Sequence, residues 1–90
     1  MKVVINRCWG GYGLSKEAYE YLGLDWDNYG KKFKNDRNNP KLIEVVEKLA
    51  EKASGKFASL KVVEIPDDID WYIHDYDGME TVKEEHRSWL

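Results

Sequence analysis

The chain has 90 residues with 42% apolar and 34% charged side chains, a composition typical of one soluble globular domain rather than a disordered segment. No apolar run approaches the length of a membrane span, and residues 1–6 are too short an apolar stretch for a signal peptide, so we expect a cytoplasmic protein without membrane contact. The single Cys8 excludes an internal disulfide, and a net charge of −3 argues against general nucleic-acid binding.

The start of the chain is predicted to form a strand, a glycine loop and a helix. Residues 2–8 favour a strand, because the β-branched residues at positions 3–5 precede a cluster of glycines. The glycine loop follows over residues 9–14. A helix is predicted over residues 16–22, because Ser15 is a good N-cap and Gly23 is a natural C-terminal stop.

The middle of the chain is predicted to hold an irregular loop and the longest helix. Residues 24–39 are rich in Asp, Asn, Lys and aromatic side chains and show no clear period. Asn39 and Pro40 then start a helix, because proline is favoured at the first helical position. Apolar residues recur at three- and four-residue spacing as far as Ala53, and Gly55 ends the element.

Three further strands are predicted after this helix. The first covers residues 58–65. The other two cover residues 70–76 and 79–82, and the turn signal Asp77-Gly78 between them predicts a hairpin.

These elements predict a small single α/β domain over residues 1–90, with the order β-α-α-β-β-β and a mixed sheet of about four strands. Helices separate the first strand from residues 60–65, so we expect these two strands to be parallel neighbours joined by a right-handed crossover. The remaining strands are expected to add an antiparallel meander.

The glycine loop is the most suggestive local feature. Gly10, Gly11 and Gly13 lie between a predicted strand and a predicted helix, where backbone N–H groups and a helix N-terminus can hold a phosphate. Their spacing matches neither the Walker loop nor the dinucleotide-binding fingerprint. A tight turn that needs positive φ angles is an equally good interpretation.

The chain lacks a complete set of residues for catalysis or metal binding. Cys8 stands where a strand enters a loop, as the nucleophile of a thiol phosphatase does, but Leu14 and Ser15 stand where that chemistry requires an arginine. A small core thiol is the preferred interpretation, and a Cys8-dependent hydrolase stays an alternative. His74 and His86 lack the spacing of a zinc site, so we expect no metal, no cofactor and no catalytic residues.

Aromatic and arginine side chains favour binding rather than catalysis. Four Trp, six Tyr and two Phe exceed what one small core absorbs, and such rings concentrate at interfaces and base-stacking surfaces. Arg7 and Arg87 stand near aromatic residues and can pair with phosphate. By contrast, Arg37 beside Asp36 predicts a plain surface ion pair.

The chain contains a distinctive set of motifs, namely Ile5-Asn6-Arg7-Cys8-Trp9-Gly10-Gly11-Tyr12-Gly13-Leu14-Ser15, Leu42-Ile43-Glu44-Val45-Val46, Leu60-Lys61-Val62-Val63-Glu64-Ile65-Pro66, Tyr76-Asp77-Gly78 and His86-Arg87-Ser88-Trp89. Through these motifs it resembles a family of small proteins common in bacteriophage genomes. Most members of the family have no assigned function. The resemblance implies a phage protein that acts in the host cytoplasm, and it associates the chain with phage proteins that sequester the cyclic-nucleotide alarm signals of bacterial defence.

We therefore predict a binding protein that sequesters a nucleotide-type signal, a cyclic oligonucleotide, without catalysis and so counters host antiviral defence. A homodimer or larger even oligomer is expected, in which a second subunit buries Trp89. The predicted ligand-binding residues are Arg7, Trp9, Gly10, Gly11, Tyr12, Gly13, Ser15, His86, Arg87 and Trp89.

The uneven charge supports an alternative hypothesis. Residues 1–41 carry a balance of +3 and residues 42–90 a balance of −6. An acidic C-terminal half could imitate a nucleic-acid backbone and block a host defence or regulatory protein. The acidic residues concerned are Asp67, Asp68, Asp70, Asp75, Asp77, Glu80, Glu84 and Glu85.

Overall fold

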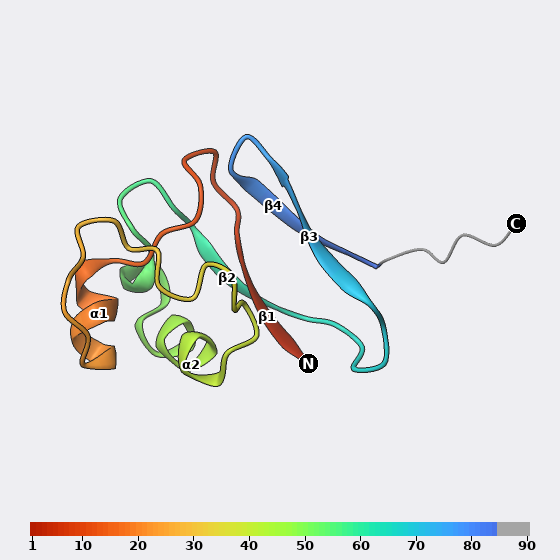
Figure 1. Cartoon of the computed structure of the whole chain (residues 1–90), viewed down its shortest axis with the longest axis horizontal. Helices are drawn as coiled ribbons and strands as arrows, with labels where there is room; N and C mark the ends of the chain where they lie inside the picture. The colour runs from red at the N-terminus through yellow and green to blue at the C-terminus, as the bar shows by residue number, and fades with distance from the viewer. Residues whose placement is uncertain (85–90) are drawn as a thin grey trace, which may run out of the picture.

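The computed structural model describes residues 1–84 and contains two α-helices and four strands, which confirms the predicted small α/β fold (Figure 1). None of the helices in this described part has the length and apolar character that crossing a membrane requires. In chain order the elements are β1 (Lys2–Asn6), α1 (Lys16–Leu22), α2 (Pro40–Leu49), the 3₁₀ helix η1 (Ala50–Ala53), β2 (Leu60–Glu64), β3 (Trp71–Tyr76) and β4 (Met79–Glu84).

The signals at the helix ends act as predicted. The Ser15 side chain caps α1 by accepting a backbone N–H of the first turn, and Gly23 ends the helix in the left-handed conformation. Asn39 caps α2 in the same way. The second helix is shorter than predicted: α2 ends at Leu49, because Ala50 adopts a φ of 52° and the chain continues as η1.

β1 and β2 are antiparallel, with Lys2 opposite Glu64 and Asn6 opposite Leu60. The predicted parallel pairing of these strands is therefore wrong. The chain leaves β1 at Asn6 and enters β2 at the residue directly opposite. The two helices between them thus belong to an excursion that returns to the same end of the strand pair, and no crossover is needed.

β3 and β4 form the predicted hairpin, in which Tyr76 faces Met79 across a two-residue turn. Asp77 and Gly78 have φ angles of 51° and 92°, the positive values that a tight hairpin turn requires. The hairpin does not share backbone pairing with β1 or β2, so the strands form two separate antiparallel pairs and not the predicted mixed sheet of about four strands.

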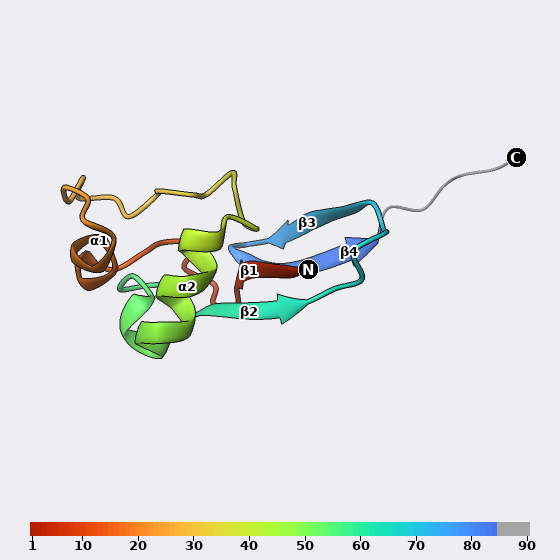
Figure 2. The same cartoon turned by 90° about the horizontal axis from the view of Figure 1, so that it is seen from below.

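The helices gather at one end of the molecule and the hairpin lies at the other, as Figures 1 and 2 both show. α2 packs against both β1 and β2, and α1 packs against α2. The apolar core therefore lies between the helices and one face of the β1–β2 pair. Its most deeply buried members are Val4, Leu14, Ala18, Tyr19, Leu42, Val45 and Ala53.

A buried ion pair covers the free edge of β1 and keeps the two strand pairs apart. Arg37 donates to both carboxylate oxygens of Glu80 at 2.6 and 2.8 Å, and both side chains are almost fully buried. The Val4 N–H donates to the Arg37 carbonyl at 2.9 Å, and the Asn6 N–H donates to Glu80 Oε1 at 2.7 Å. We call these four residues the seam. The Arg37 carbonyl and the Glu80 carboxylate accept the β1 hydrogen bonds that a neighbouring strand would otherwise accept.

The seam also corrects the prediction for Arg37. Its partner is the buried Glu80 and not the adjacent Asp36, and its guanidinium stacks 4.1 Å from the centre of the Tyr12 ring. The Asn6 side chain ties the hairpin to β1, because its Nδ2 donates to the carbonyls of Cys8 and Gly78 at 2.7 and 2.6 Å. The hairpin is thus attached by polar side chains rather than by strand pairing.

Candidate functional site

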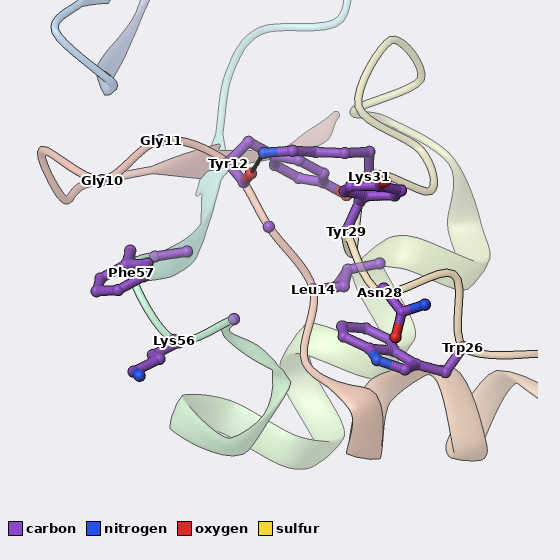
Figure 3. Close-up of a pocket in the computed structure, with 13 residues that line it drawn as sticks. Gly10, Gly11, Tyr12, Leu14, Trp26, Asn28, Tyr29, Lys31, Lys56 and Phe57 are labelled. Atoms are coloured by element: carbon purple, nitrogen blue, oxygen red, sulfur yellow. Dashed lines mark hydrogen bonds between the residues drawn. The ribbon is translucent and has the colours of Figure 1, made fainter.

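A cleft of about 300 Å³ opens beside the glycine loop (Figure 3). Three loops form its walls, at residues 10–14, 26–31 and 55–58. Its side-chain lining is aromatic and basic, and no Asp or Glu of residues 1–84 contributes to it. The residues that matter for its chemistry are Tyr12, Trp26, Tyr29, Lys31, Lys56 and Phe57.

The wall at residues 26–31 is built around Asp27. Its Oδ1 accepts the N–H groups of Tyr29 and Gly30, both at 2.8 Å, and its Oδ2 accepts the Tyr19 hydroxyl at 2.8 Å. The hydrogen bonds from Gly30 and Tyr29 hold the pKa of the Asp27 carboxyl below its usual value. This part of the predicted irregular loop is therefore an ordered turn, and it presents Tyr29 with 76% of its surface exposed.

Close packing of the three loops explains the glycines at positions 10, 30 and 55, but not those at positions 11 and 13, where an added Cβ would meet no atom within 4 Å. The Leu14 N–H donates to the Gly30 carbonyl at 2.7 Å, and the Gly55 N–H donates to the Gly13 carbonyl at 2.8 Å. A Cβ at Gly10 would lie 2.1 Å from the carbonyl oxygen of Phe57, so no larger residue fits there. The tight-turn interpretation is supported at Gly11, whose φ is 88°, whereas Gly10 is explained by its close approach to Phe57.

Two loop N–H groups are candidates for a ligand. Within residues 1–84, the N–H groups of Tyr12 and Gly13 have no hydrogen-bond acceptor in the protein. The helix terminus contributes less than expected, because α1 is short and Ser15 satisfies its first turn by accepting the Ala18 N–H at 3.0 Å.

Four of the predicted ligand-binding residues, Gly10, Gly11, Tyr12 and Gly13, line the cleft. Tyr12 contributes its backbone, because its ring is buried beneath Arg37 and its hydroxyl donates to the Lys32 carbonyl at 2.6 Å. Burial raises the pKa of the Tyr12 hydroxyl far above its usual value, which fits this structural role.

The other predicted residues lie elsewhere. Arg7 donates to the Glu80 carbonyl at 2.7 Å and is absent from the cleft lining. Trp9 is 59% exposed and packs edge-on against Tyr76, and Ser15 acts as the cap of α1. The predicted residues His86, Arg87 and Trp89 lie outside the described residues.

Sequence reasoning missed the residues that complete the cleft, namely Trp26, Tyr29, Lys31, Lys56 and Phe57. A signal was present, because residues 24–39 interleave aromatic side chains with Lys and Asn, and Lys56-Phe57 directly follows a glycine.

The positive charge of the cleft comes from two lysines. Lys31 Nζ donates to the Tyr12 carbonyl at 2.6 Å, so its ammonium group is held at the cleft wall, as Figure 3 shows. Lys56 Nζ lies 5.4 Å from the centre of the Phe57 ring. A concave surface with aromatic rings and ammonium groups suits a planar, negatively charged ligand.

Other candidate chemistries find less support in the described residues. No group of three metal-ligating side chains occurs among residues 1–84. The Cys8 thiol is unpaired and only partly accessible. Glu80 was predicted to belong to the acidic surface, but it is buried in the seam. Asp67, Asp68 and Asp70 are exposed as that hypothesis requires.

Comparison with known proteins adds no relative: no family model matches the chain, and searches of curated proteins and of solved structures also return no match. The resemblance to small bacteriophage proteins therefore stays a prediction.

Proposed function

We propose that this protein binds a nucleotide-type ligand in the cleft and does not turn it over. The observation that carries the proposal is the composition of the lining: Trp26, Tyr29, Phe57, Lys31 and Lys56 meet there without any acidic residue. The ammonium groups of such a lining attract an anion, its aromatic rings can stack on a flat ring system, and within residues 1–84 it holds no carboxylate that would repel the anion.

Each part of the cleft has a counterpart in a nucleotide. The exposed rings of Tyr29 and Phe57 offer faces on which a base can stack. Lys31 and Lys56 supply cations for phosphate, and the N–H groups of Tyr12 and Gly13 supply neutral donors. In this proposal Arg7 supports the seam by donating to the Glu80 carbonyl, and it does not contact the ligand.

The biological role that we propose is sequestration of a cyclic oligonucleotide signal in the cytoplasm of an infected host. This part of the proposal is supported by the resemblance to small bacteriophage proteins. The alternative, an inhibitor of a host protein, keeps the support of the exposed acidic residues Asp67, Asp68 and Asp70. A pull-down from host lysate that yields a salt-sensitive protein partner, with no small molecule bound, would favour that alternative.

A thermal-shift screen against cyclic di- and trinucleotides tests the binding function. We expect a rise in melting temperature with at least one compound, and a Lys56→Gln variant should bind it about tenfold more weakly because a charge-assisted contact is lost. Lys48→Gln is the matched control, since Lys48 is an exposed lysine on α2 outside the cleft. No shift with any compound near millimolar concentration would overturn the proposal.

We also propose that the chain forms a homodimer or larger even oligomer, which is supported by its exposed rings. The largest exposed apolar side chains include Trp9, Tyr29, Phe57, Tyr72 and Tyr76. Light scattering on the intact protein, and on a chain that ends at Arg87, tests both the assembly and the role predicted for Trp89. A monomer mass for the intact protein at tens of micromolar would exclude the assembly.

A further inference from the structure

An exposed aromatic pair stands next to the cleft. Trp9 in the glycine loop and Tyr76 at the hairpin tip pack edge to face, with ring centres 6.0 Å apart. Their exposed fractions are 59% and 63%, so neither ring serves the apolar core. An exposed tryptophan that is held by a second ring is a surface ready for stacking.

The pair is fixed in place by the backbone. A Cβ at Gly78 would lie 2.4 Å from the Trp9 carbonyl oxygen and 2.6 Å from the Gly11 nitrogen, so the hairpin tip sits directly against the glycine loop. The Asn6 side chain bonds the carbonyls on both sides of this contact, at Cys8 and Gly78. A platform that is already ordered loses little conformational entropy when a ligand binds.

The pair and the cleft form one continuous surface. Gly10 follows Trp9 and contacts the backbone of Phe57, whose 67% exposed ring lines the cleft. In Figure 1 the glycine loop lies between the residue 55–58 turn and the hairpin tip. The Trp9–Tyr76 pair therefore stands beside the Phe57 side of the cleft.

The size of the cleft favours a ligand that extends beyond it. About 300 Å³ is at the lower end of the range for small-molecule sites, which suits a single nucleotide unit. Resting on the proposed function, we infer that the ligand contains at least two linked nucleotides, with one base held in the cleft and a second base stacked on the Trp9–Tyr76 pair. A mononucleotide uses only the cleft.

The test compares linked and single nucleotides by calorimetry on the full chain. The probes are cyclic di-AMP against AMP and cyclic di-GMP against GMP. For at least one pair, the cyclic dinucleotide should bind about tenfold more tightly than its monomer, the gain expected from one further base stacking on an aromatic ring. Trp9→Leu should remove this gain and leave the affinity for the monomer within about twofold.

Two further variants make the result specific. Tyr76→Leu should also remove the gain, and it replaces Trp9→Leu if that variant does not fold. Tyr72→Leu is the control, because Tyr72 is an exposed aromatic residue on the same strand as Tyr76 but outside the pair. It should change neither affinity.

The outcomes separate this inference from the proposed function. Equal affinities for monomer and dinucleotide, or an unchanged gain in Trp9→Leu, overturn the inference while nucleotide binding stands. The absence of binding by all four probes overturns the inference, and the proposed function is overturned as well only if the screen of cyclic di- and trinucleotides also gives no shift. A fall in oligomer mass in Trp9→Leu, with the dinucleotide gain unchanged, assigns the pair to a protein interface instead and also overturns the inference.

Discussion

The seam and the cleft each place a cation near an aromatic ring, and the two regions expose these groups to opposite degrees. In the seam, Arg37 and Glu80 are 6% and 3% exposed, and Tyr12 beneath them is 3% exposed. In the cleft, Tyr29 and Phe57 are 76% and 67% exposed. Both regions pair cations with aromatic rings, but only the cleft leaves these groups open to another molecule.

The difference teaches where stability and binding reside. No buried side-chain nitrogen or oxygen in the described part of the chain lacks a hydrogen-bond partner, so the removal of one seam residue leaves another buried group unpaired. The removal of a cleft residue leaves its neighbours in water. Changes in the seam should therefore lower the stability of the protein, and changes to the exposed side chains of the cleft should alter ligand binding at nearly constant stability.

The largest expected effect is that of Glu80→Ala. This change leaves the Arg37 guanidinium buried without its partner and removes the acceptor of the Asn6 N–H, so the free energy of unfolding should fall by about 3–5 kcal/mol. Urea denaturation measures it. Glu84→Ala, an exposed change on the same strand, is the control and should stay within about 0.5 kcal/mol. A loss below about 1 kcal/mol in Glu80→Ala would contradict the role given to the seam.

Gly10→Ala should have the next largest effect. Its Cβ would lie 2.1 Å from the Phe57 carbonyl oxygen, so the two loops must move apart at a cost of about 1–3 kcal/mol. Gly13→Ala is the matched control, because no atom lies within 4 Å of its Cβ. Equal stability losses in the two variants would show that packing does not explain the glycine at position 10.

Ser15→Ala distinguishes a cap from a ligand contact. Loss of the N-cap bond to the Ala18 N–H, and of the bond that the hydroxyl donates to the Lys52 carbonyl, should lower the free energy of unfolding by about 1 kcal/mol. Ser15→Thr keeps a hydroxyl that can make both bonds and should restore it. Affinity for a cyclic dinucleotide should not change in either variant. A loss of affinity in Ser15→Ala with normal stability would instead support the sequence-based assignment of Ser15 to the ligand.

The smallest expected effect concerns acid and the cleft wall. The folded pKa of Asp27 is lowered, so its contribution to stability is complete above the unfolded value near 3.9 and is lost as the pH falls through the folded value. The unfolding midpoint of Asp27→Asn should therefore fall less steeply than that of the wild type below about pH 4. Parallel curves for the two proteins between pH 5 and pH 2 would show that Asp27 does not contribute.

The sequence predicted the elements whose signals are local. Ser15 and Gly23 mark the ends of α1, and Asp77-Gly78 marks the hairpin, because each acts through neighbouring backbone groups. The pairing of Arg37 with Glu80 could not be predicted in this way. Its partners are distant in the chain, and the nearby Asp36 offered a simpler local alternative.

The candidate site was predicted only in part for a related reason. The glycine loop was found because glycines between a strand and a helix are a recognisable pattern. The opposite walls, with Tyr29, Lys31 and Phe57, come from two loops without regular periodicity, and only the packing of Gly30 and Gly55 against the glycine loop brings them together.

The central claim is that the cleft binds a nucleotide while the seam only supports the fold. A titration of the ¹⁵N-labelled protein with cyclic di-AMP and cyclic di-GMP, followed by amide chemical shifts, tests it most directly. The account predicts that the largest shifts occur at Tyr12, Gly13, Tyr29 and Phe57, and that the amides of Val4, Asn6 and Glu80 stay nearly unchanged. Largest shifts at the seam, or no shifts with either compound, would contradict the account.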